Sequence, residues 1–360
     1  MRVVLVAEQL RRTVPGGIGT YVRGLVKGLG DMGGDAPDLT LWASRLPARR
    51  DDPVIGLGLP TVISSLPPAA LVRSWDQGWS AYAGAADVVH APSLAVPPRR
   101  RCPLAVTVHD LAWRQVPEAF PPRGRRWHEA ALGRALARAS LLITPSRATA
   151  DALVASGARA DRVEVVEEGC DHLPEADDEA AAAVLSNLGV TGPYLLSVGT
   201  LEPRKNVARL LAAYHAARPL LPEPWPLVVV GPAGWGEREP STDGDGVVMA
   251  GWVGAAALAG LYRRARTVAY VPLLEGFGLP AVEAMAAGTP VVASPMPSTG
   301  GAALEVDPTD VDAIAAALVT ASTDEEARTQ LCAAGLRRAS TLTWEATARA
   351  HVELWRALGE

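Results

Sequence analysis

The sequence contains few of the residues on which several protein classes depend. Its three cysteines, Cys102, Cys170 and Cys332, lie too far apart in the chain to predict a metal or redox pair. Its six histidines show no metalloprotease spacing. No apolar run approaches the ~18 residues of a membrane span, and the one at the N-terminus is too short for a signal-peptide core. We therefore expect a soluble, cytoplasmic protein without a metal ion or other cofactor.

Lysine is also scarce. Lys27 and Lys205 are the only lysines among 34 basic residues, so the other 32 are arginine. With abundant Ala, Gly and Pro, this skew indicates the codon bias of a GC-rich genome. The 39 acidic residues give a net charge of −5. Because phosphate contacts require clustered positive charge, this balance argues against a dedicated nucleic-acid-binding protein.

A chain of 360 residues has room for about two domains, each with its own core. Short β-branched segments alternate with longer helices rich in Ala, Leu and Arg, which predicts α/β layers. Strands that are apolar throughout favour a parallel sheet buried on both faces. In the first half we expect strands at 2–7, 39–43, 88–90, 104–109, 141–145 and 163–166, and helices that include 20–29 and 123–139.

The alternation stops at residues 171–189, an acidic segment without a strand, and then restarts. We expect a first domain at 1–172, a linker at 173–190 and a second domain at 191–340. Two doubly wound sheets predict a ligand site in the cleft between the domains, at the carboxyl ends of the strands. The expected strands of the second half are 193–197, 227–230, 247–250, 267–271, 291–293 and 304–306, and helices at 324–340 and 344–358 end the chain.

Four segments that follow predicted strands carry residues suited to chemistry. The first, residues 16–21, reads GGIGTY and opens a helix. Gly16 and Gly17 let the backbone approach a ligand, and the unpaired N–H groups of a helix start favour an anion or a polyhydroxyl compound. The segment lacks the third glycine of a dinucleotide fingerprint and the Lys-Ser/Thr pair of a P-loop. A simple structural turn remains an alternative.

The second segment is a buried strand that ends in His109 and Asp110. A histidine at a strand end in a cleft can donate a hydrogen bond to a sugar hydroxyl or a carbonyl. The alternative is a core histidine bonded to backbone. Trp113, one turn later, is either a core residue or a stacking surface, and the core is favoured.

The third segment, residues 197–206, reads SVGTLEPRKN and contains a strand, a loop and a helix start. Arg204 and Lys205 suit a diphosphate, since arginine binds it in a bidentate manner and lysine acts as a point charge. A lysine in a chain that otherwise uses arginine indicates that the ammonium group itself is required. A solvated helix start is the alternative.

The fourth segment, residues 272–292, reads PLLEGFGLPAVEAMAAGTPVV and is the most specific. Pro280 suits the first turn of a helix, so the amides of Phe277–Leu279 are expected to point at a ligand phosphate. Glu275 precedes these amides and Glu283 lies one turn inside the helix. Carboxylates are poor phosphate ligands but good acceptors for sugar and ribose hydroxyls.

The spacing of the two glutamates, with seven residues between them, resembles the signature of the retaining glycosyltransferases of family 4, which have the GT-B fold. The resemblance covers nearly the whole chain, because GGIGTY, TVHDL, TPSRATADAL, SVGTLEPRKN, the carboxylate motif and AALEVDPTD follow in the family's order. TVHDLAW…PEAF and SVGTLEPRKN are similar to bacterial mannosyltransferases that use GDP-mannose. The GT-B resemblance also implies an acceptor-binding first domain, a nucleotide-sugar-binding second domain, and a helix at 341–360 that crosses back to the first domain.

The resemblance implies roles for the matching residues. Glu275 would hold hydroxyls of the donor sugar, and Glu283 would hold the ribose. Arg204 and Lys205 would neutralise the diphosphate, which makes a metal ion unnecessary. His109 would lie beside the sugar near the reacting carbon, and it would be catalytic together with Glu275, Arg204 and Lys205. Further donor-binding positions are Gly17, Thr200, Gly231, Val253, Gly276, Phe277, Gly278 and Leu279, and candidate acceptor-binding positions are Gly16, Tyr21, Asp110 and Trp113.

Three departures from the family pattern stand out. Thr200 occupies a position where many members carry arginine, so Arg204 would act alone. Glu168-Gly169 replaces the familiar Asn-Gly before the linker. The segment after Ala293 is short and lacks the common Pro-Glu-Val, which would reshape the wall near the ribose or the diphosphate.

Together these residues predict transfer of a hexose, with mannose favoured, from a nucleotide-diphosphate sugar to an acceptor hydroxyl with retention of configuration. GDP-mannose is the favoured donor and a UDP-sugar the alternative. The acceptor would be a glycan, a lipid-linked sugar or a small molecule. Arg123, Arg125 and Arg126 form either a solvated helix start, which is favoured, or a peripheral contact with the inner face of a membrane. The pair Asp243 and Asp245 is interpreted as a surface turn rather than a metal site.

Two other classes of protein fit the sequence less well. A NAD-dependent dehydrogenase requires the GxGxxG turn and an acidic strand end about twenty residues later, and neither is present. A catalytically inactive nucleotide-sugar-binding protein of the same fold is disfavoured, because the chain retains His109 and the four charged residues of the donor motifs.

Overall fold

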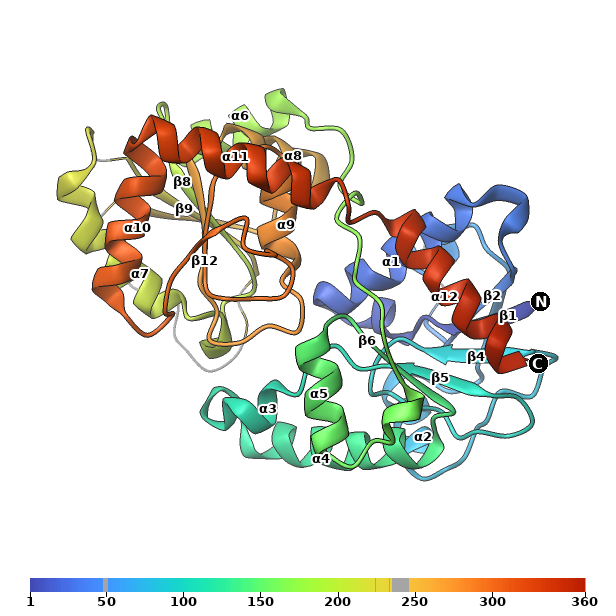
Figure 1. Ribbon diagram of the computed structural model, residues 1–360. Helices are drawn as coiled ribbons and strands as arrows, with labels where there is room; N and C mark the ends of the chain where they lie inside the picture. The colour runs from blue at the N-terminus through green and yellow to red at the C-terminus, as the bar shows by residue number, and fades with distance from the viewer. Residues whose placement is uncertain (48–50, 224, 233, 235–245, 360) are drawn as a thin grey trace. The chain divides into compact units, whose positions relative to one another are not determined.

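The computed structural model describes residues 1–47, 51–223, 225–232, 234 and 246–359. The chain forms two compact α/β units (Figure 1). The first unit comprises Met1–Leu111, Pro122–His172 and Thr343–Glu360, so both ends of the chain belong to it. The second unit comprises Ala112–Pro121 and Leu173–Leu342.

The first unit is built on a seven-stranded sheet in the order β3-β2-β1-β4-β5-β6-β7, and every neighbouring pair is parallel. Strands β4, β5 and β6 are buried along their whole length, which explains why all but one residue of each is apolar. The strands are β1 Arg2–Val6, β2 Asp38–Ala43, β3 Thr61–Ile63, β4 Val88–Ala91, β5 Leu104–Thr107, β6 Leu141–Thr144 and β7 Val163–Val165.

Helix α1 (Gly16–Asp31) packs against α12 (Trp344–Gly359), the last helix of the chain (Figure 1). Two glycines make this close approach possible. A Cβ on Gly24 would lie 2.1 Å from the Trp344 ring, and one on Gly28 would lie 2.0 Å from the Trp344 carbonyl oxygen. The other helices of this unit are α2 Pro68–Asp76, α4 Pro122–Arg138 and α5 Arg147–Ala155.

The second unit contains a six-stranded parallel sheet in the order β10-β9-β8-β11-β12-β13. Its strands are β8 Leu195–Val198, β9 Leu227–Val230, β10 Val247–Gly251, β11 Thr267–Tyr270, β12 Val291–Ala293 and β13 Leu304–Glu305. Its helices are α3 Ala112–Gln115, α6 Asp178–Asn187, α7 Val207–Ala217, α8 Ala255–Arg264, α9 Leu279–Ala286, α10 Val311–Thr323 and α11 Glu325–Ala339.

Two parallel sheets of this kind agree with the predicted fold class, and most expected strands match within one or two residues. Helix α1 begins at Gly16 rather than at Thr20, so the GGIG segment is its first turn. The segment expected as a linker contains α6, which packs on α8 within the second unit because Gly260 lets the two helices approach. Strand β3 and helix α2 were not predicted from the sequence.

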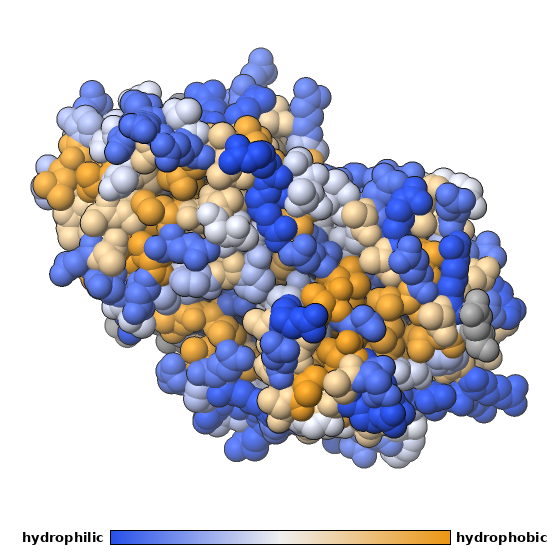
Figure 2. Space-filling view, viewed as in Figure 1, coloured by the Kyte–Doolittle hydropathy of each residue, from blue (hydrophilic) through white to orange (hydrophobic). Residues whose placement is uncertain are grey.

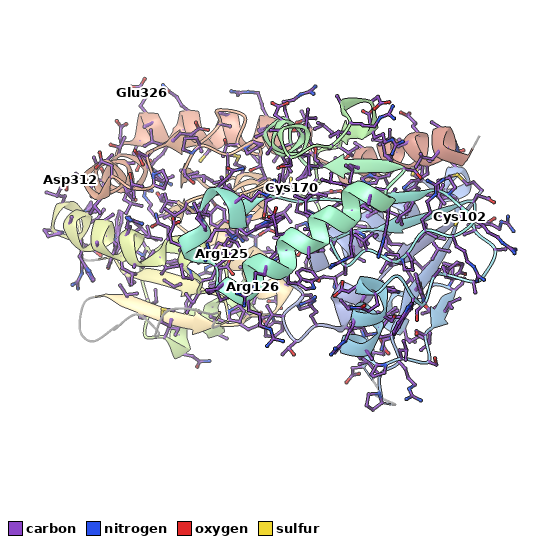
Figure 3. The ribbon with its side chains drawn as sticks, turned by 90° about the horizontal axis from the view of Figure 1, so that it is seen from below. Cys102, Arg125, Arg126, Cys170, Asp312 and Glu326 are labelled. Atoms are coloured by element: carbon purple, nitrogen blue, oxygen red, sulfur yellow. The ribbon has the colours of Figure 1, made fainter. Side chains whose placement is uncertain are left out.

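The three cysteines are free thiols, and Cys102 and Cys170 lie far apart (Figure 3). Among the described residues, none of the helices combines the length and apolarity needed to cross a membrane. Apolar surface is visible on the near face of each unit and is interrupted by hydrophilic residues (Figure 2). Within the same described ranges, no cluster of His, Cys, Asp and Glu is arranged to hold a metal ion. Asp243 and Asp245, interpreted above as a turn, lie outside the described residues.

Candidate functional site

In the second unit, the parallel sheet brings two of the predicted motifs together. Strands β8 and β11 are neighbours, so the loops after their carboxyl ends lie at the same edge of the sheet. The amide of Leu273 donates to the Arg204 carbonyl oxygen at 2.9 Å, which joins the two loops directly. Arg204, Lys205 and Glu275 therefore meet, although about seventy residues separate them in the sequence.

One oxygen of Glu275 is the centre of this cluster. Its Oε1 lies 2.6 Å from Lys205 Nζ and 2.8 Å from an Arg204 guanidinium nitrogen. The Tyr270 hydroxyl accepts a hydrogen bond from Lys205 at 2.5 Å and donates to the same Oε1 at 2.8 Å. Oε2 has no hydrogen-bond partner among the described residues, which leaves its lone pairs for hydroxyl groups of a ligand.

The cluster is electrically balanced before any ligand binds. Burial of Glu275 opposes its ionisation, but the charges of Arg204 and Lys205 outweigh burial and lower its pKa to about 2. A second buried carboxylate, Glu202, lies 2.8 Å from Arg204, and burial raises its pKa. Two cations thus face two carboxylates. An incoming diphosphate would disturb this balance and attract both cations.

The amides predicted to bind phosphate lie beside this cluster, at the start of α9. Gly278 has a φ of +104°, and a Cβ there would lie 2.3 Å from Met296 Sδ. Only glycine therefore fits this position without strain. The amides of Phe277, Gly278 and Leu279 donate no hydrogen bond to the described part of the chain, and Gly276 before them is buried. Such free amides at a helix start suit a phosphate oxygen.

Glu283, predicted to hold the ribose, lies inside α9 and is 8% exposed. Its Oε2 accepts a hydrogen bond of 2.7 Å from the Tyr262 hydroxyl of α8. Tyr262 thereby fixes the orientation of this carboxylate. Its predicted contact with ribose stays a prediction.

The remaining donor-binding predictions concern loops near β8, β9 and β10. Thr200 and Val253 are half-buried in the loops after β8 and β10. The amide of Gly231 donates to the Gly251 carbonyl oxygen at 2.8 Å, so it is not available to a base. A Cβ on Gly231 would lie 1.9 Å from the Gly199 carbonyl oxygen. Close packing of two loops therefore explains this glycine.

In the first unit, His109 lies two residues beyond β5 and is held by two acceptors. Its Nδ1 lies 3.0 Å from Glu168 Oε1, and its Nε2 lies 3.0 Å from the Pro92 carbonyl oxygen. Burial lowers its pKa, but the hydrogen bond and the charge of Glu168 outweigh burial, and the pKa is raised. The expectation that a ring N–H of His109 donates to the sugar therefore needs correction, because both ring nitrogens already have partners.

Tyr21 was predicted to bind the acceptor, and this prediction is wrong. The side chain is 1% exposed and belongs to the core of the first unit. Its hydroxyl lies 3.0 Å from Thr107 Oγ1 and 2.6 Å from His351 Nε2, so it is already bonded within the protein. Its position on the core-facing side of α1 explains this, since Tyr21, Val22, Leu25 and Leu29 share that side.

The other predicted acceptor residues have different surroundings. Gly16 and Gly17 are exposed, and a Cβ on either would meet no atom within 4 Å. Packing does not require these glycines, which leaves open space over the first turn of α1. Asp110 is half-buried. Trp113 is 4% exposed, so it is a core residue, as the favoured interpretation held.

A cavity of about 550 Å³ also opens in the second unit, away from the Glu275 cluster. Arg266 and Arg328 line it, and both hold neighbouring segments together. Arg266 donates to the Ser322 carbonyl oxygen and pairs with Glu325, while Arg328 donates to the carbonyl oxygens of Arg266 and Ala321. These contacts indicate a structural role for this cavity wall.

Known protein families match both units. The pattern of the family described as "Glycosyltransferase Family 4" matches residues 15–172, and that of "Glycosyl transferases group 1" matches residues 192–324. The O-antigen chain mannosyltransferase B of Escherichia coli is 33% identical over 272 residues, which cover 72% of this chain and 71% of that protein. The chain belongs to glycosyltransferase family 4. It is therefore a glycosyltransferase with the GT-B fold.

Other relatives and solved structures agree with this family. A D-inositol 3-phosphate glycosyltransferase of Kineococcus radiotolerans is 36% identical over 231 residues, covering 56% of this chain and 53% of that protein. Anabaena HepE, solved in complex with UDP and glucose, has a TM-score of 0.74 at 20% identity, covering 99% of this chain and 100% of that one. The sucrose-phosphate synthase of Thermosynechococcus elongatus has a TM-score of 0.74 at 21% identity, covering 99% of each chain. At these identities the structures show the fold alone.

Sequence reasoning missed several residues that position the motifs of this glycosyltransferase. Each of them contacts a predicted residue: Glu168 contacts His109, Tyr270 and Glu202 contact the Arg204–Lys205 pair, and Tyr262 contacts Glu283. One signal was available for Tyr270, which carries the one side-chain hydroxyl of the otherwise apolar segment VAYVP. A buried tyrosine hydroxyl requires a hydrogen-bond partner, and the glutamate motif begins five residues later.

Proposed function

We propose that this family 4 enzyme transfers a hexose, with mannose favoured, from a nucleotide-diphosphate sugar to an acceptor hydroxyl, with retention at the anomeric carbon. The observation that carries the proposal is the cluster of Arg204, Lys205 and Glu275 beside the free amides at the start of α9. It offers two cations for a diphosphate and one free carboxylate oxygen for sugar hydroxyls. That combination suits a nucleotide sugar.

In the proposed reaction, the bond from the anomeric carbon to the phosphate oxygen breaks and a bond to the acceptor oxygen forms on the same face. The acceptor proton passes to the departing phosphate oxygen, so the nucleoside diphosphate leaves with it. Arg204 and Lys205 stabilise the charge that develops on the phosphate. Because Oε1 of Glu275 is bonded to these two cations, this carboxylate is suited to binding hydroxyls rather than to acting as a nucleophile.

His109 completes the proposed catalytic set from the first unit, and Glu283 binds the ribose of the donor. The first-turn amides near Gly17 are proposed as a further contact of the diphosphate. The fixed cations make a divalent metal ion unnecessary for transfer. Activity that is unchanged by a chelator supports this point, and activity that a chelator abolishes and magnesium restores contradicts it.

The choice of mannose rests on the relative from Escherichia coli, whose name assigns mannosyl transfer. A UDP-sugar is the alternative donor, because the neighbour from Anabaena was solved with UDP and glucose. The acceptor is proposed to be a glycan, a lipid-linked sugar or a small molecule. The exposed side chains of Arg123 and Arg126, with half-buried Arg125 between them at the start of α4 (Figure 3), fit a peripheral contact with the cytoplasmic face of a membrane.

The experiment is a donor panel with the purified protein. GDP-mannose, UDP-glucose and related donors are offered one at a time, and nucleotide release is measured with and without candidate acceptors. Release from GDP-mannose in preference to the UDP-sugars, with an α-linked product by NMR, supports the proposal. Binding of nucleotides without release from any donor indicates an inactive sugar-nucleotide-binding protein instead.

A further inference from the structure

We propose that Glu168 is a positioning residue for transfer, which holds His109 as an imidazolium whose two ring N–H groups are both fixed inside the first unit. The inference rests on the proposed function for its catalytic consequence. Its structural part stands on hydrogen bonds within the first unit.

The partners of the ring determine its protonation. A carbonyl oxygen cannot donate a hydrogen bond, so His109 Nε2 must carry the proton that bonds to Pro92. The other nitrogen, Nδ1, faces the Glu168 carboxylate at 3.0 Å. An ionised carboxylate only accepts, so opposite an ionised Glu168 the Nδ1 atom carries a proton too. A neutral His109 would place a lone pair against the carboxylate.

Two more buried histidines lie near this ring, and burial favours the neutral form of both. His351 Nδ1 donates to the Thr347 carbonyl oxygen at 2.7 Å, and in a neutral ring its Nε2 then accepts from the Tyr21 hydroxyl. Tyr21 in turn accepts from the Thr107 hydroxyl, which accepts from His90 Nε2. In this arrangement each of the four side chains donates one hydrogen bond. His90 Nδ1 is buried without a partner in the described chain.

The charged and titratable groups around His109 come from five segments. Glu168 follows β7, Asp110 is the next residue in the chain, and His90, His351 and Tyr21 belong to β4, α12 and α1. Burial lowers the pKa of His90, and it lowers that of His351 to about 4, with the charge of His109 adding to both shifts. Burial raises the pKa of Tyr21. Of the three histidines, only His109 therefore has a carboxylate partner that stabilises a positive charge.

This arrangement changes what His109 offers to a substrate. Its side chain is 16% exposed, and both N–H groups are already used. What remains is the positively polarised C–H edge of a fixed ring, which can donate a weak hydrogen bond to a sugar oxygen. The Tyr21 ring packs edge-on against it at 4.8 Å between centroids and restricts its movement. Glu168 thus supplies orientation and charge without contacting the sugar.

The test compares Glu168→Gln, which keeps the shape and removes the charge, with Glu168→Asp, which keeps the charge. Glu164→Gln is the matched control, because Glu164 is an exposed carboxylate on β7. The titration of His109 is followed by NMR of protein with ¹⁵N-labelled histidine, assigned with His109→Gln. This readout requires no transferase activity. Loss of an ion-pair partner shifts a pKa by about 1 unit or more.

We expect the His109 titration midpoint to fall in Glu168→Gln, to stay higher in Glu168→Asp, and to be unchanged in Glu164→Gln. In nucleotide release, the imidazolium form is active below its pKa and activity is lost as pH rises through it. The alkaline limb of kcat should therefore move to lower pH in Glu168→Gln, with little change in KM. Equal midpoints in wild type and Glu168→Gln overturn the structural part. A shifted midpoint with an unchanged pH profile overturns the positioning role, while a shifted midpoint in a protein that uses no donor overturns only the proposed function.

Discussion

Replacement of Lys205 by methionine removes the central charge of the proposed donor site. The Lys205 side chain is 14% exposed, and its ammonium group lies 2.6 Å from Glu275 Oε1 and 2.5 Å from the Tyr270 hydroxyl. Methionine keeps much of the apolar stem, so it fills a similar space. It removes the positive charge and the hydrogen bonds. The substitution therefore tests the charge more than the packing.

The magnitude follows from the distance at which such a charge acts. Two unit charges ~4 Å apart attract by about 4 kcal/mol at an effective dielectric constant of ~20. Since about 1.4 kcal/mol corresponds to a factor of ten in rate, loss of that interaction in the transition state slows transfer by about 10³. Arg204 binds the same carboxylate at 2.8 Å and supplies part of the charge stabilisation. We expect turnover to fall by about 10²–10³.

The assay is nucleotide release at saturating donor, with thermal melting as a check of folding. Lys27→Met is the matched control, because it removes the only other lysine of the chain. Lys27 is 44% exposed and pairs with Asp31 at 2.6 Å on the surface of α1. The control should retain wild-type turnover. If Lys205→Met keeps turnover within tenfold of the wild type, Lys205 does not stabilise the leaving group.

Three further predictions concern the same unit. Tyr270→Phe removes a hydroxyl that orients the lysine and Glu275, so turnover should fall about tenfold while the protein stays folded; wild-type nucleotide release would contradict this. Gly278→Ala should lower the free energy of unfolding in urea by about 1–2 kcal/mol or more, because φ is +104° and the Cβ would meet Met296. Gly30→Ala inside α1 is the control and should not lower it. Similar urea midpoints for the two variants would contradict the predicted strain at Gly278. The pKa of Glu275 in the folded protein is lowered to about 2 from 4.5, so the stability that its charge contributes is complete above about pH 4.5 and is lost as the pH falls toward 2. Urea midpoints should therefore fall more over this pH range in the wild type than in Glu275→Gln. Parallel curves for the two proteins would disprove this linkage.

Much of the fold could be predicted because strands and helices of this chain have different local patterns. Strands β9 and β12 match their predicted bounds, since each is a short aliphatic segment between polar or Gly/Pro residues. Strand β3 was missed because it has only three residues, two of them exposed, at the edge of its sheet. Although Val62 and Ile63 are apolar, so short a segment gives no period on which a strand prediction can depend.

The predicted site was partly right for a similar reason. The Arg204–Lys205 pair and Glu275 could be found because each stands in a loop after an apolar strand, and neighbouring parallel strands bring such loops together. The prediction that Tyr21 binds the acceptor was wrong. It directly follows the GGIGT segment, but α1 begins at Gly16, and the helical turn directs its side chain into the core. A local motif does not determine which side of a helix its last residue occupies.

The partners of the site residues depend on sheet topology rather than on local spacing. Glu168 and His109 are 59 residues apart, yet each follows a strand by two or three residues. Those strands, β5 and β7, flank β6, so their carboxyl ends lie at the same edge of the sheet. Once the strand order is known, the positions of the two residues in the sequence are enough to pair an ionisable residue with a site histidine. The strand order is therefore what makes the glutamate at position 168 informative about the charge of His109.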